Sequence, residues 1–366
     1  MGKLIIKLEE MYSNHINKKW EQYRIKEQKY HEIYDWYNRV VKSPNNFDMP
    51  LLTRLKMYKH GFTSDDYKKY DLENNSMADY ISEVDRWKSR RINGIYNIIL
   101  DDKQIFYRVF KDDVSTPKII GTIKDGKLLD VNNHIVSTNA IMKMLRKENG
   151  LVFRINYSGG GNGLHILRFL DNHLEVNGLK MNINKLSDFI KESEGSIVTE
   201  ALKNAKYSAE IFDKAVNTLR IIVAKENGSD KYEVVETFHR FGCNESIPGD
   251  NVCRGGLIAP IDMSTGIIGK ATSKKSLEYY DRHPDTDAKI EGVVVPNFEL
   301  IKTRLLEVAY KHPYLNLIAW DVVVTENGFD IIEGNASSDI NMLQYFGGLK
   351  NKRLGEIYKS YGIGER

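Results

Sequence analysis

The stretch from Asp321 to Asn335 constrains the fold more than any other part of this chain. Its apolar residues recur near every second position on both sides of Glu326-Asn327-Gly328. Such alternation around a short polar turn predicts two antiparallel strands joined as a hairpin. The chain should therefore contain a sheet with this ribbon in it.

The spacing within this ribbon also predicts which side chains meet. If the loop has three residues, with a positive φ at the glycine, Thr325 pairs with Phe329 and Asp321 lies opposite Glu333. Because strand side chains alternate between faces, Asn335 then shares a face with Glu333. One side of the hairpin gathers two carboxylates and a carboxamide.

Oxygen ligands of this kind suit Mg²⁺, which usually takes one or two protein carboxylates and completes its shell with phosphate oxygens and water. The hairpin therefore indicates a nucleotide site. The alternative is that Asp321 and Asn335 are ordinary polar residues near strand ends and that Glu333 faces solvent.

Length and composition narrow the class of protein. A chain of 366 residues is longer than one compact core usually absorbs, so we expect two or three subdomains. A net charge of +3 is too weak to favour nucleic acid as a partner. Cys243 and Cys253 form no CxxC pair, which favours neither disulfides nor zinc. Without a secretory signal or an apolar run of the ~20 residues that span a bilayer, a cytoplasmic enzyme is expected.

The N-terminal region is expected to be helical as far as residue 95. Residues 3–42 contain no proline or glycine and place apolar, mostly aromatic residues three and four positions apart, which predicts a long amphipathic helix. Its aromatic stripe could contact a membrane surface or a partner protein, but a packed helix face is the favoured interpretation. Short helices are expected from residue 51 to about 92, and a mixed α and β region follows.

Residues 151–166 predict a strand, a glycine-rich loop and another strand. Glycines let backbone amides approach phosphate oxygens, and Arg154 on the incoming strand could add charge. The spacing is neither a Walker loop nor a dinucleotide fingerprint, so an ordinary glycine-rich turn is the alternative.

Two further strands are expected to carry arginines. Arg220 lies in a strand that starts near Asn217, and Arg240 ends the next one. On one face of a ribbon, the two guanidinium groups would suit phosphate or carboxylate. A loop with Asp250, Asn251 and Arg254 follows and is either part of the site or an ordinary polar loop. An amphipathic helix is expected over residues 297–311.

In this order the motifs resemble the ATP-grasp superfamily, and more narrowly its sugar-transfer-associated branch. The likeness runs from about Leu52 to Asn341 and includes Tyr58–Phe62, Asp101–Lys103 and Trp320-Asp321. It implies an α+β fold in which two α+β subdomains sandwich ATP behind the helical N-terminal region. Residues 96–200 would form a pre-ATP-grasp remnant and the small nucleotide-binding lobe, and residues 201–366 the large lobe with the metal-binding hairpin.

The resemblance also implies roles for single residues. Asp321, Glu333 and Asn335 would hold magnesium on the nucleotide phosphates. Lys103 and Arg154 would contact phosphate, with Arg154 standing where the family usually has a lysine. The remaining nucleotide-binding residues would be Ser158, Gly159, Gly160, Gly161 and Gly163 over the phosphates, and Glu200, Ala201 and Leu202 as the hinge against the adenine; Glu210 is a candidate for the ribose. Arg220 and Arg240 would steady the transferring phosphoryl group as catalytic residues, and the third catalytic residue, Arg254, would line the acceptor side with the substrate-binding Asp250 and Asn251.

The activity implied is an ATP- and Mg²⁺-dependent carboxylate–amine ligase that forms an amide through an acyl phosphate. The branch suggests an amino acid or amine joined to a carboxylated sugar in the synthesis of a surface polysaccharide such as capsule. The alternatives are a kinase for a small molecule or sugar, a peptide ligase of a natural-product pathway, and a non-catalytic nucleotide-binding partner of glycosyltransferases that docks through the N-terminal helix. The intact set of Asp321, Glu333 and Asn335 argues against the last.

Overall fold

The computed structural model describes residues 2–147, 149–156 and 163–364. The chain divides into two compact units, one of residues 1–77 with 82–87 and the other of residues 78–81 with 88–366.

The first unit is helical. The long helix predicted from the sequence is confirmed as α1 (Gly2–Asp35) continued by the π-helical turn η1 (Trp36–Val41), and it is followed by α2 (Leu51–Lys59), α3 (Asp66–Lys69) and α4 (Glu83–Lys88). At the end of the long helix Val40 is fully buried, and Trp36 Nε1 donates a hydrogen bond of 2.7 Å to the Tyr58 carbonyl.

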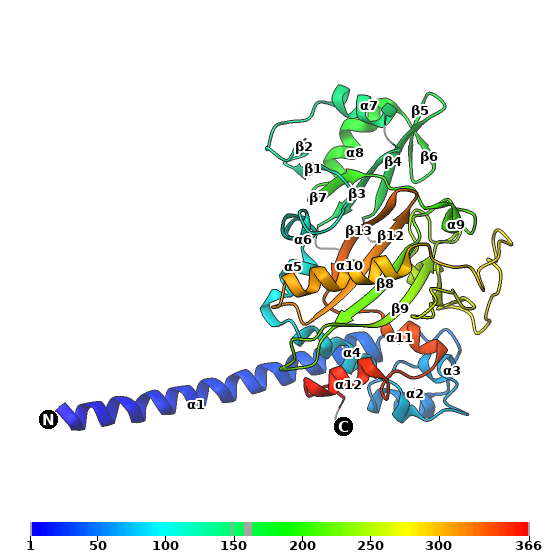
Figure 1. Ribbon diagram of the computed structural model, residues 1–366. Helices are drawn as coiled ribbons and strands as arrows, with labels where there is room; N and C mark the ends of the chain where they lie inside the picture. The colour runs from blue at the N-terminus through cyan, green and yellow to red at the C-terminus, as the bar shows by residue number, and fades with distance from the viewer. Residues whose placement is uncertain (1, 148, 157–162, 365–366) are drawn as a thin grey trace. The chain divides into compact units, whose positions relative to one another are not determined.

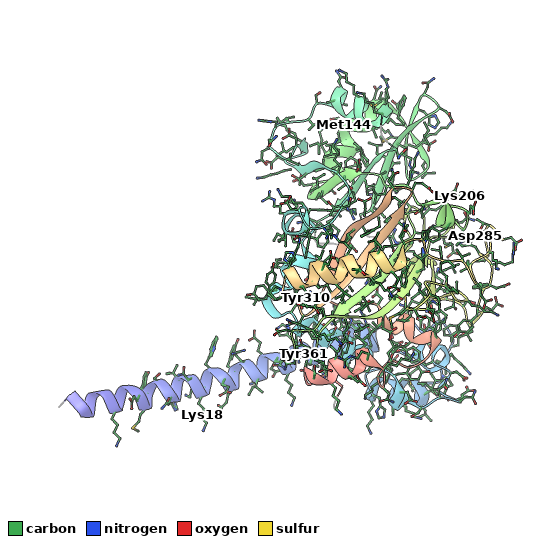
Figure 2. The ribbon with its side chains drawn as sticks, in the orientation of Figure 1. Lys18, Met144, Lys206, Asp285, Tyr310 and Tyr361 are labelled. Carbon is green, nitrogen blue, oxygen red and sulfur yellow. The ribbon has the colours of Figure 1, made fainter. Side chains whose placement is uncertain are left out.

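Most of the aromatic stripe on α1 is uncovered. Trp20 is 62% exposed and Tyr30 63% exposed, and Figure 2 shows side chains such as Lys18 standing off the helix. The prediction that this face is packed is therefore wrong for the described side chains. Periodicity shows which side of a helix is apolar, but it does not show whether the same chain supplies a covering surface.

The second unit contains two sheets, both antiparallel throughout their described pairs (Figure 1). The seven-stranded sheet has the order β2-β1-β7-β3-β4-β5-β6. Its strands are β1 (Ile119–Lys124), β2 (Lys127–Leu129), β3 (Leu151–Ile155), β4 (His165–Leu170), β5 (His173–Val176), β6 (Leu179–Met181) and β7 (Ser196–Glu200). Its core joins Leu151 and Phe153 to Ile141 of α7 (Thr138–Lys147) and Leu186 of α8 (Leu186–Glu192).

The six-stranded sheet has the order β11-β10-β9-β8-β12-β13 and contains the hairpin predicted from the sequence. Its strands are β8 (Thr218–Ala224), β9 (Glu233–Phe241), β10 (Leu257–Pro260), β11 (Thr272–Ser273), β12 (Leu317–Thr325) and β13 (Gly328–Asn335). One face is apolar, with Leu219, Ile221 and Trp320 packed against α6 (Lys103–Phe110) and α10 (Phe298–Lys311), which lies along the sheet in Figure 1. The other face carries Arg220 and Asp321 among buried apolar residues such as Ile222.

Short helices complete the second unit: η2 (Met77–Asp79), η3 (Ser89–Arg91), η4 (Gly94–Tyr96), α5 (Asn97–Asp101), η5 (Ile183–Lys185), α9 (Lys206–Ala209), η6 (Val252–Arg254), α11 (Ile340–Leu343), η7 (Gln344–Phe346) and α12 (Arg353–Ser360). The expected α+β fold behind a long N-terminal helix is confirmed. None of the helices in the described residues is long and apolar enough to cross a bilayer.

The hairpin corrects one detail of the sequence prediction. Val324 pairs with Phe329 and Thr325 with Gly328, so the loop has two residues and the predicted Thr325–Phe329 pair is wrong. Asp321 nevertheless lies opposite Glu333, because the register shifts after Asp321 and Ile332 is an extra residue in β13. This β-bulge offsets the shorter loop.

Candidate functional site

Register places a group of charged residues on the face of the six-stranded sheet that α6 and α10 do not cover. Asp321 on β12 pairs with Arg220 on β8 and with Glu333 on β13. Two residues along β8, Thr218 pairs with Arg240 on β9. Because partners in register share a face and side chains alternate along a strand, these five residues project from the same side of the sheet.

Asp321 is held by two arginines. Arg220 donates from Nε to Oδ1 and from Nη2 to Oδ2, the latter at 3.1 Å, and Arg240 Nη2 lies 2.9 Å from Oδ2. Asp321 and Arg220 are only 1% and 3% exposed. Burial alone would raise the pKa of the Asp321 carboxyl, but the two guanidinium groups outweigh it and lower the pKa below its ordinary value. Asp321 is therefore ionised and fixed in position.

Arg240 is fixed in turn by the start of β8. Its Nε and Nη2 donate to Thr218 Oγ1 at 2.9 and 2.6 Å, and its Nε lies 3.5 Å from Asp250 Oδ2. The same Asp250 oxygen accepts hydrogen bonds of 2.9 and 2.5 Å from Thr218 N and Oγ1. Burial raises the pKa of Asp250, although Arg240 opposes the shift. Asp250 thus helps to hold the Arg240 guanidinium in position, directly and through Thr218.

The other two residues of that loop are placed differently. Asn251 caps η6, where its Oδ1 accepts a 2.8 Å hydrogen bond from Cys253 N. Arg254 is exposed. The assignment of Asn251 and Arg254 to the acceptor side stays a prediction.

Lys103 reaches the hairpin from α6. Its Nζ lies 3.8 Å from Glu333 Oε2 and 3.4 Å from the Asn156 carbonyl. Burial lowers the pKa of Lys103, and Glu333 opposes the shift. On the same face of the hairpin, Asn335 Nδ2 donates to the Ala319 carbonyl at 3.4 Å. The cation and the oxygen ligands predicted from the sequence are thus neighbours.

Arg154 meets two groups that the sequence analysis did not single out. Its Nη2 donates to the hydroxyl of Tyr107, and its Nη1 donates to the Ile332 carbonyl at 3.2 Å. Two residues further along the chain, Asn156 Oδ1 accepts a hydrogen bond of 3.1 Å from Gln104 N, and Asn156 Nδ2 donates one of 2.8 Å to Asp102 Oδ2. The strand that carries Arg154 is therefore tied to the start of α6. Tyr107 lies four residues after Lys103, which places both on one face of the helix. This spacing is the sequence signal that could have revealed Tyr107.

The residues on this face fit a magnesium ion shared with phosphate. The described residues contain no group of three or more His, Cys, Asp or Glu side chains suited to a metal. Asp321 gives both oxygens to arginines, which leaves Glu333 and the Asn335 carboxamide oxygen as the freer ligands. A protein site with so few ligands is incomplete for most metals but ordinary for Mg²⁺, which takes its other ligands from phosphate and water.

The remaining predicted nucleotide-binding residues belong to the glycine-rich loop and the hinge. Ser158, Gly159, Gly160 and Gly161 lie outside the described residues. Gly163 has φ +67°, and a Cβ there would lie 2.3 Å from Ile155 Cδ1, so only glycine fits. Glu200 ends β7 and its Oε1 accepts a 3.0 Å hydrogen bond from Lys118 N.

The predicted hinge lies between the two sheets. Ala201 donates to the Gly150 carbonyl next to β3, and Ala205 donates to the Val324 carbonyl in β12, at 2.9 and 2.8 Å. Leu202 lies between these two attachment points. Lys206 at the start of α9, labelled in Figure 2, donates its N–H to Glu326 Oε1 at 2.5 Å. Glu210, the ribose candidate, is exposed and lies 3.7 Å from Lys206 Nζ.

One protein family matches most of the chain. The family described as "Sugar-transfer associated ATP-grasp" matches residues 85–357 of the chain. No curated protein matches it in sequence.

Several solved structures resemble the chain distantly. The biotin carboxylase domain of 2-oxoglutarate carboxylase from Hydrogenobacter thermophilus, in complex with MgADP, ADP and bicarbonate, matches at 14% identity over 66% of this chain and 41% of that chain, with a TM-score of 0.37. D-alanine–D-alanine ligase from Bacillus anthracis in complex with ATP matches at 13% identity over 73% and 68%, with a TM-score of 0.38. N5-carboxyaminoimidazole ribonucleotide synthetase from Thermus thermophilus matches at 7% over 72% and 53%, with a TM-score of 0.40. The chain thus spans about two fifths to two thirds of these proteins.

Proposed function

Because the chain belongs to the sugar-transfer associated ATP-grasp family, we propose that it is an ATP- and Mg²⁺-dependent ligase that joins a carboxylate to an amine. The observation that carries the proposal is the pair of arginines on Asp321, on the same sheet face as Glu333. Guanidinium groups and carboxylates lie side by side there. The guanidinium groups can bind phosphate oxygens, and the carboxylates can bind the metal ion that accompanies the phosphate.

Glu333, Asn335 and Asp321 would hold the metal, and Lys103 and Arg154 would contact the nucleotide phosphates. Bound there, Mg²⁺ neutralises charge on the phosphate oxygens. Lys103 lies 3.8 Å from Glu333, so it would meet the phosphates beside the metal ligand. Lys103 and Arg220 are both buried. Because water is largely excluded from their charged groups, each interacts more strongly with a bound anion.

In the proposed reaction the substrate carboxylate oxygen attacks the γ-phosphorus of ATP, and the bond from that phosphorus to the β,γ-bridging oxygen breaks to release ADP. An amine nitrogen then attacks the carbonyl carbon of the acyl phosphate, and inorganic phosphate leaves as the amine loses a proton. Arg220 and Arg240 would hold the negative oxygens in both steps. No protein nucleophile takes part, so positioning and charge neutralisation do the work.

This geometry favours a ligase over a kinase. A hydroxyl acceptor needs a general base, whereas a carboxylate is already ionised. Asp321 is bound by both arginines, and Asp250, the second buried carboxylate beside Arg240, accepts two hydrogen bonds from Thr218 at its Oδ2. We propose that the acceptor side takes a carboxylated sugar or its amine partner in polysaccharide synthesis; support for this substrate class comes from the family description alone.

The test measures phosphate release by the purified protein with MgATP and a panel of uronic acids and amino acids or amines. Release that requires both partners supports the ligase, and Glu333→Gln should reduce it on the order of a hundredfold or more, as loss of one group that acts on transition-state charge does. Glu326→Gln is the matched control on the same hairpin and should leave the rate unchanged.

Three results would contradict the proposal. A stable phosphorylated product formed without amine would identify a kinase. Tight ATP binding without turnover across the panel would identify a nucleotide-binding partner of other enzymes. Near-normal activity of the Glu333 variant would overturn the metal assignment.

A further inference from the structure

The guanidinium of Arg154 is fixed by two acceptors from different parts of the fold. Tyr107 comes from α6, and its ring centroid lies 5.8 Å from the Arg154 guanidinium carbon. The Ile332 carbonyl comes from β13 in the other sheet. Tyr107 is fully buried, and its hydroxyl also donates to the Ile332 carbonyl at 3.0 Å. The three groups form a closed triangle of hydrogen bonds.

The bulge in β13 makes this triangle possible. In a regular antiparallel strand every second carbonyl points to the neighbouring strand. Ile332 is the extra residue of the bulge, so it has no partner on β12 and its carbonyl accepts from Tyr107 and Arg154 instead. The next residue is Glu333, and the orientation of the predicted metal ligand is thereby coupled to Arg154.

The same helix serves both cations of the nucleotide site. Lys103 and Tyr107 lie four residues apart on α6, which places them on one helix face. Lys103 lies against Glu333, and Tyr107 holds Arg154. Arg154 Nε is buried and has no hydrogen-bond partner among the described residues. A buried donor of this kind is costly unless a ligand supplies the acceptor.

We propose that Tyr107 is a positioning residue that orients the Arg154 guanidinium for a nucleotide phosphate, and that the site therefore requires arginine rather than lysine. The inference rests on the proposed nucleotide-dependent function. A guanidinium has five N–H donors in a rigid plane, so it can bind Tyr107 and Ile332 and still donate to phosphate. A lysine has the charge but only one nitrogen, and its flexible stem has no plane for the tyrosine to fix.

The test is a double-mutant cycle in full-length protein, with MgADP affinity measured by titration calorimetry for the wild type, Tyr107→Phe, Arg154→Lys and the double variant. Each single change should weaken binding on the order of tenfold, because each removes a hydrogen bond to a charged group or its alignment. The double variant should be no weaker than Arg154→Lys alone, since Tyr107 acts through the arginine. Tyr232→Phe is the control, because it also removes a buried hydroxyl that donates to a carbonyl, here Leu315 at 2.9 Å, and it should bind MgADP like the wild type.

Failure of this inference and failure of the proposed function give different results. A wild type that does not bind MgADP refutes the proposed function. A wild type that binds, together with a Tyr107→Phe variant of equal affinity or with additive losses in the double variant, refutes the positioning role. If Tyr107→Phe does not fold, Arg154→Lys decides alone: the proposal requires a clear loss of affinity, and wild-type affinity would overturn it.

Discussion

At the scale of single residues, the site depends on buried charges that only their partners make tolerable. Asp321 and its two arginines lie in the sheet where a lone charge would be strongly unfavourable. The sequence predicted one face of the hairpin for Asp321 and suggested one face of another ribbon for Arg220 and Arg240; the structure places all three in direct contact. What alternation could not predict is that the arginines bind the aspartate itself, because strand spacing carries no information on side-chain pairing across strands far apart in sequence.

Removing one of the two arginines that bind Asp321 should destabilise the folded protein. Arg220→Met leaves Asp321 with a single guanidinium, and we expect the free energy of unfolding to fall by about 3–5 kcal/mol. Arg282→Met is the matched control, because Arg282 forms a 2.8 Å ion pair with Asp287 whose side chains are 49% and 85% exposed, and such a pair contributes about 0–1 kcal/mol. Urea denaturation of both variants measures the contrast. Equal losses in the two would mean that burial does not govern the strength of these pairs.

A buried histidine gives the stability a pH dependence. His239 is fully buried, and a hydrogen bond of 2.9 Å joins its Nε2 to the Tyr207 hydroxyl. Burial lowers the pKa of His239 to about 3. In the unfolded chain the pKa is about 6.5, so between these values the unfolded state binds the extra proton and stability falls as the pH falls. From pH 7 to pH 5 the contribution of His239 should be a loss of about 2 kcal/mol.

The His239→Gln variant tests this assignment. Glutamine does not titrate, so the difference in unfolding free energy between pH 7 and pH 5 should be smaller in the variant than in the wild type by about 2 kcal/mol. The comparison is made by urea denaturation at both pH values. A variant with the same pH dependence as the wild type would show that other groups are responsible.

At the scale of elements, the hairpin shows how far local patterns reach. The polar turn and the alternation of β12 and β13 predicted the strands, and the predicted Asp321–Glu333 pair holds because the bulge offsets the shorter loop. The loop length was predicted one residue too long, and the bulge at Ile332 was not predicted. The reason is that the bulge is stabilised by Tyr107 and Arg154, which approach from α6 and β3, and no short-range pattern contains that contact.

Gly334 is the residue of the hairpin that is most constrained by its neighbours. It lies between Glu333 and Asn335 but faces the opposite side, where a Cβ would lie 2.8 Å from Leu100 Cδ2 and 3.0 Å from Phe106 Cε2. Gly334→Ala should therefore cost about 1–3 kcal/mol of stability through overpacking. The control is Gly249→Ala, whose new methyl would meet only Leu164 Cδ2, at 3.2 Å, and should cost less. Equal losses on urea denaturation would contradict the packing argument.

At the scale of the whole molecule, Arg154 links the two sheets of the second unit. Arg154 on β3 donates to the Ile332 carbonyl of the hairpin, and Lys103 and Tyr107 contact the same hairpin from α6. The family resemblance predicted roles for Lys103, Arg154 and the hinge, but it did not single out Tyr107. A nucleotide bound to both cations and to the hairpin would add further contacts across the same junction.

Nucleotide and metal should therefore stabilise the protein together. A ligand that binds only the folded state stabilises it by about 2.7 kcal/mol at a concentration one hundred times its Kd, so MgADP at that level should raise Tm by several degrees. Removing the metal with EDTA should abolish most of the rise, because Glu333 and Asn335 contribute only through the ion. The Glu333→Gln variant should gain less from MgADP than the wild type, while the Glu326→Gln control gains as much. An equal rise in Tm with ADP and EDTA would mean that the hairpin holds no metal.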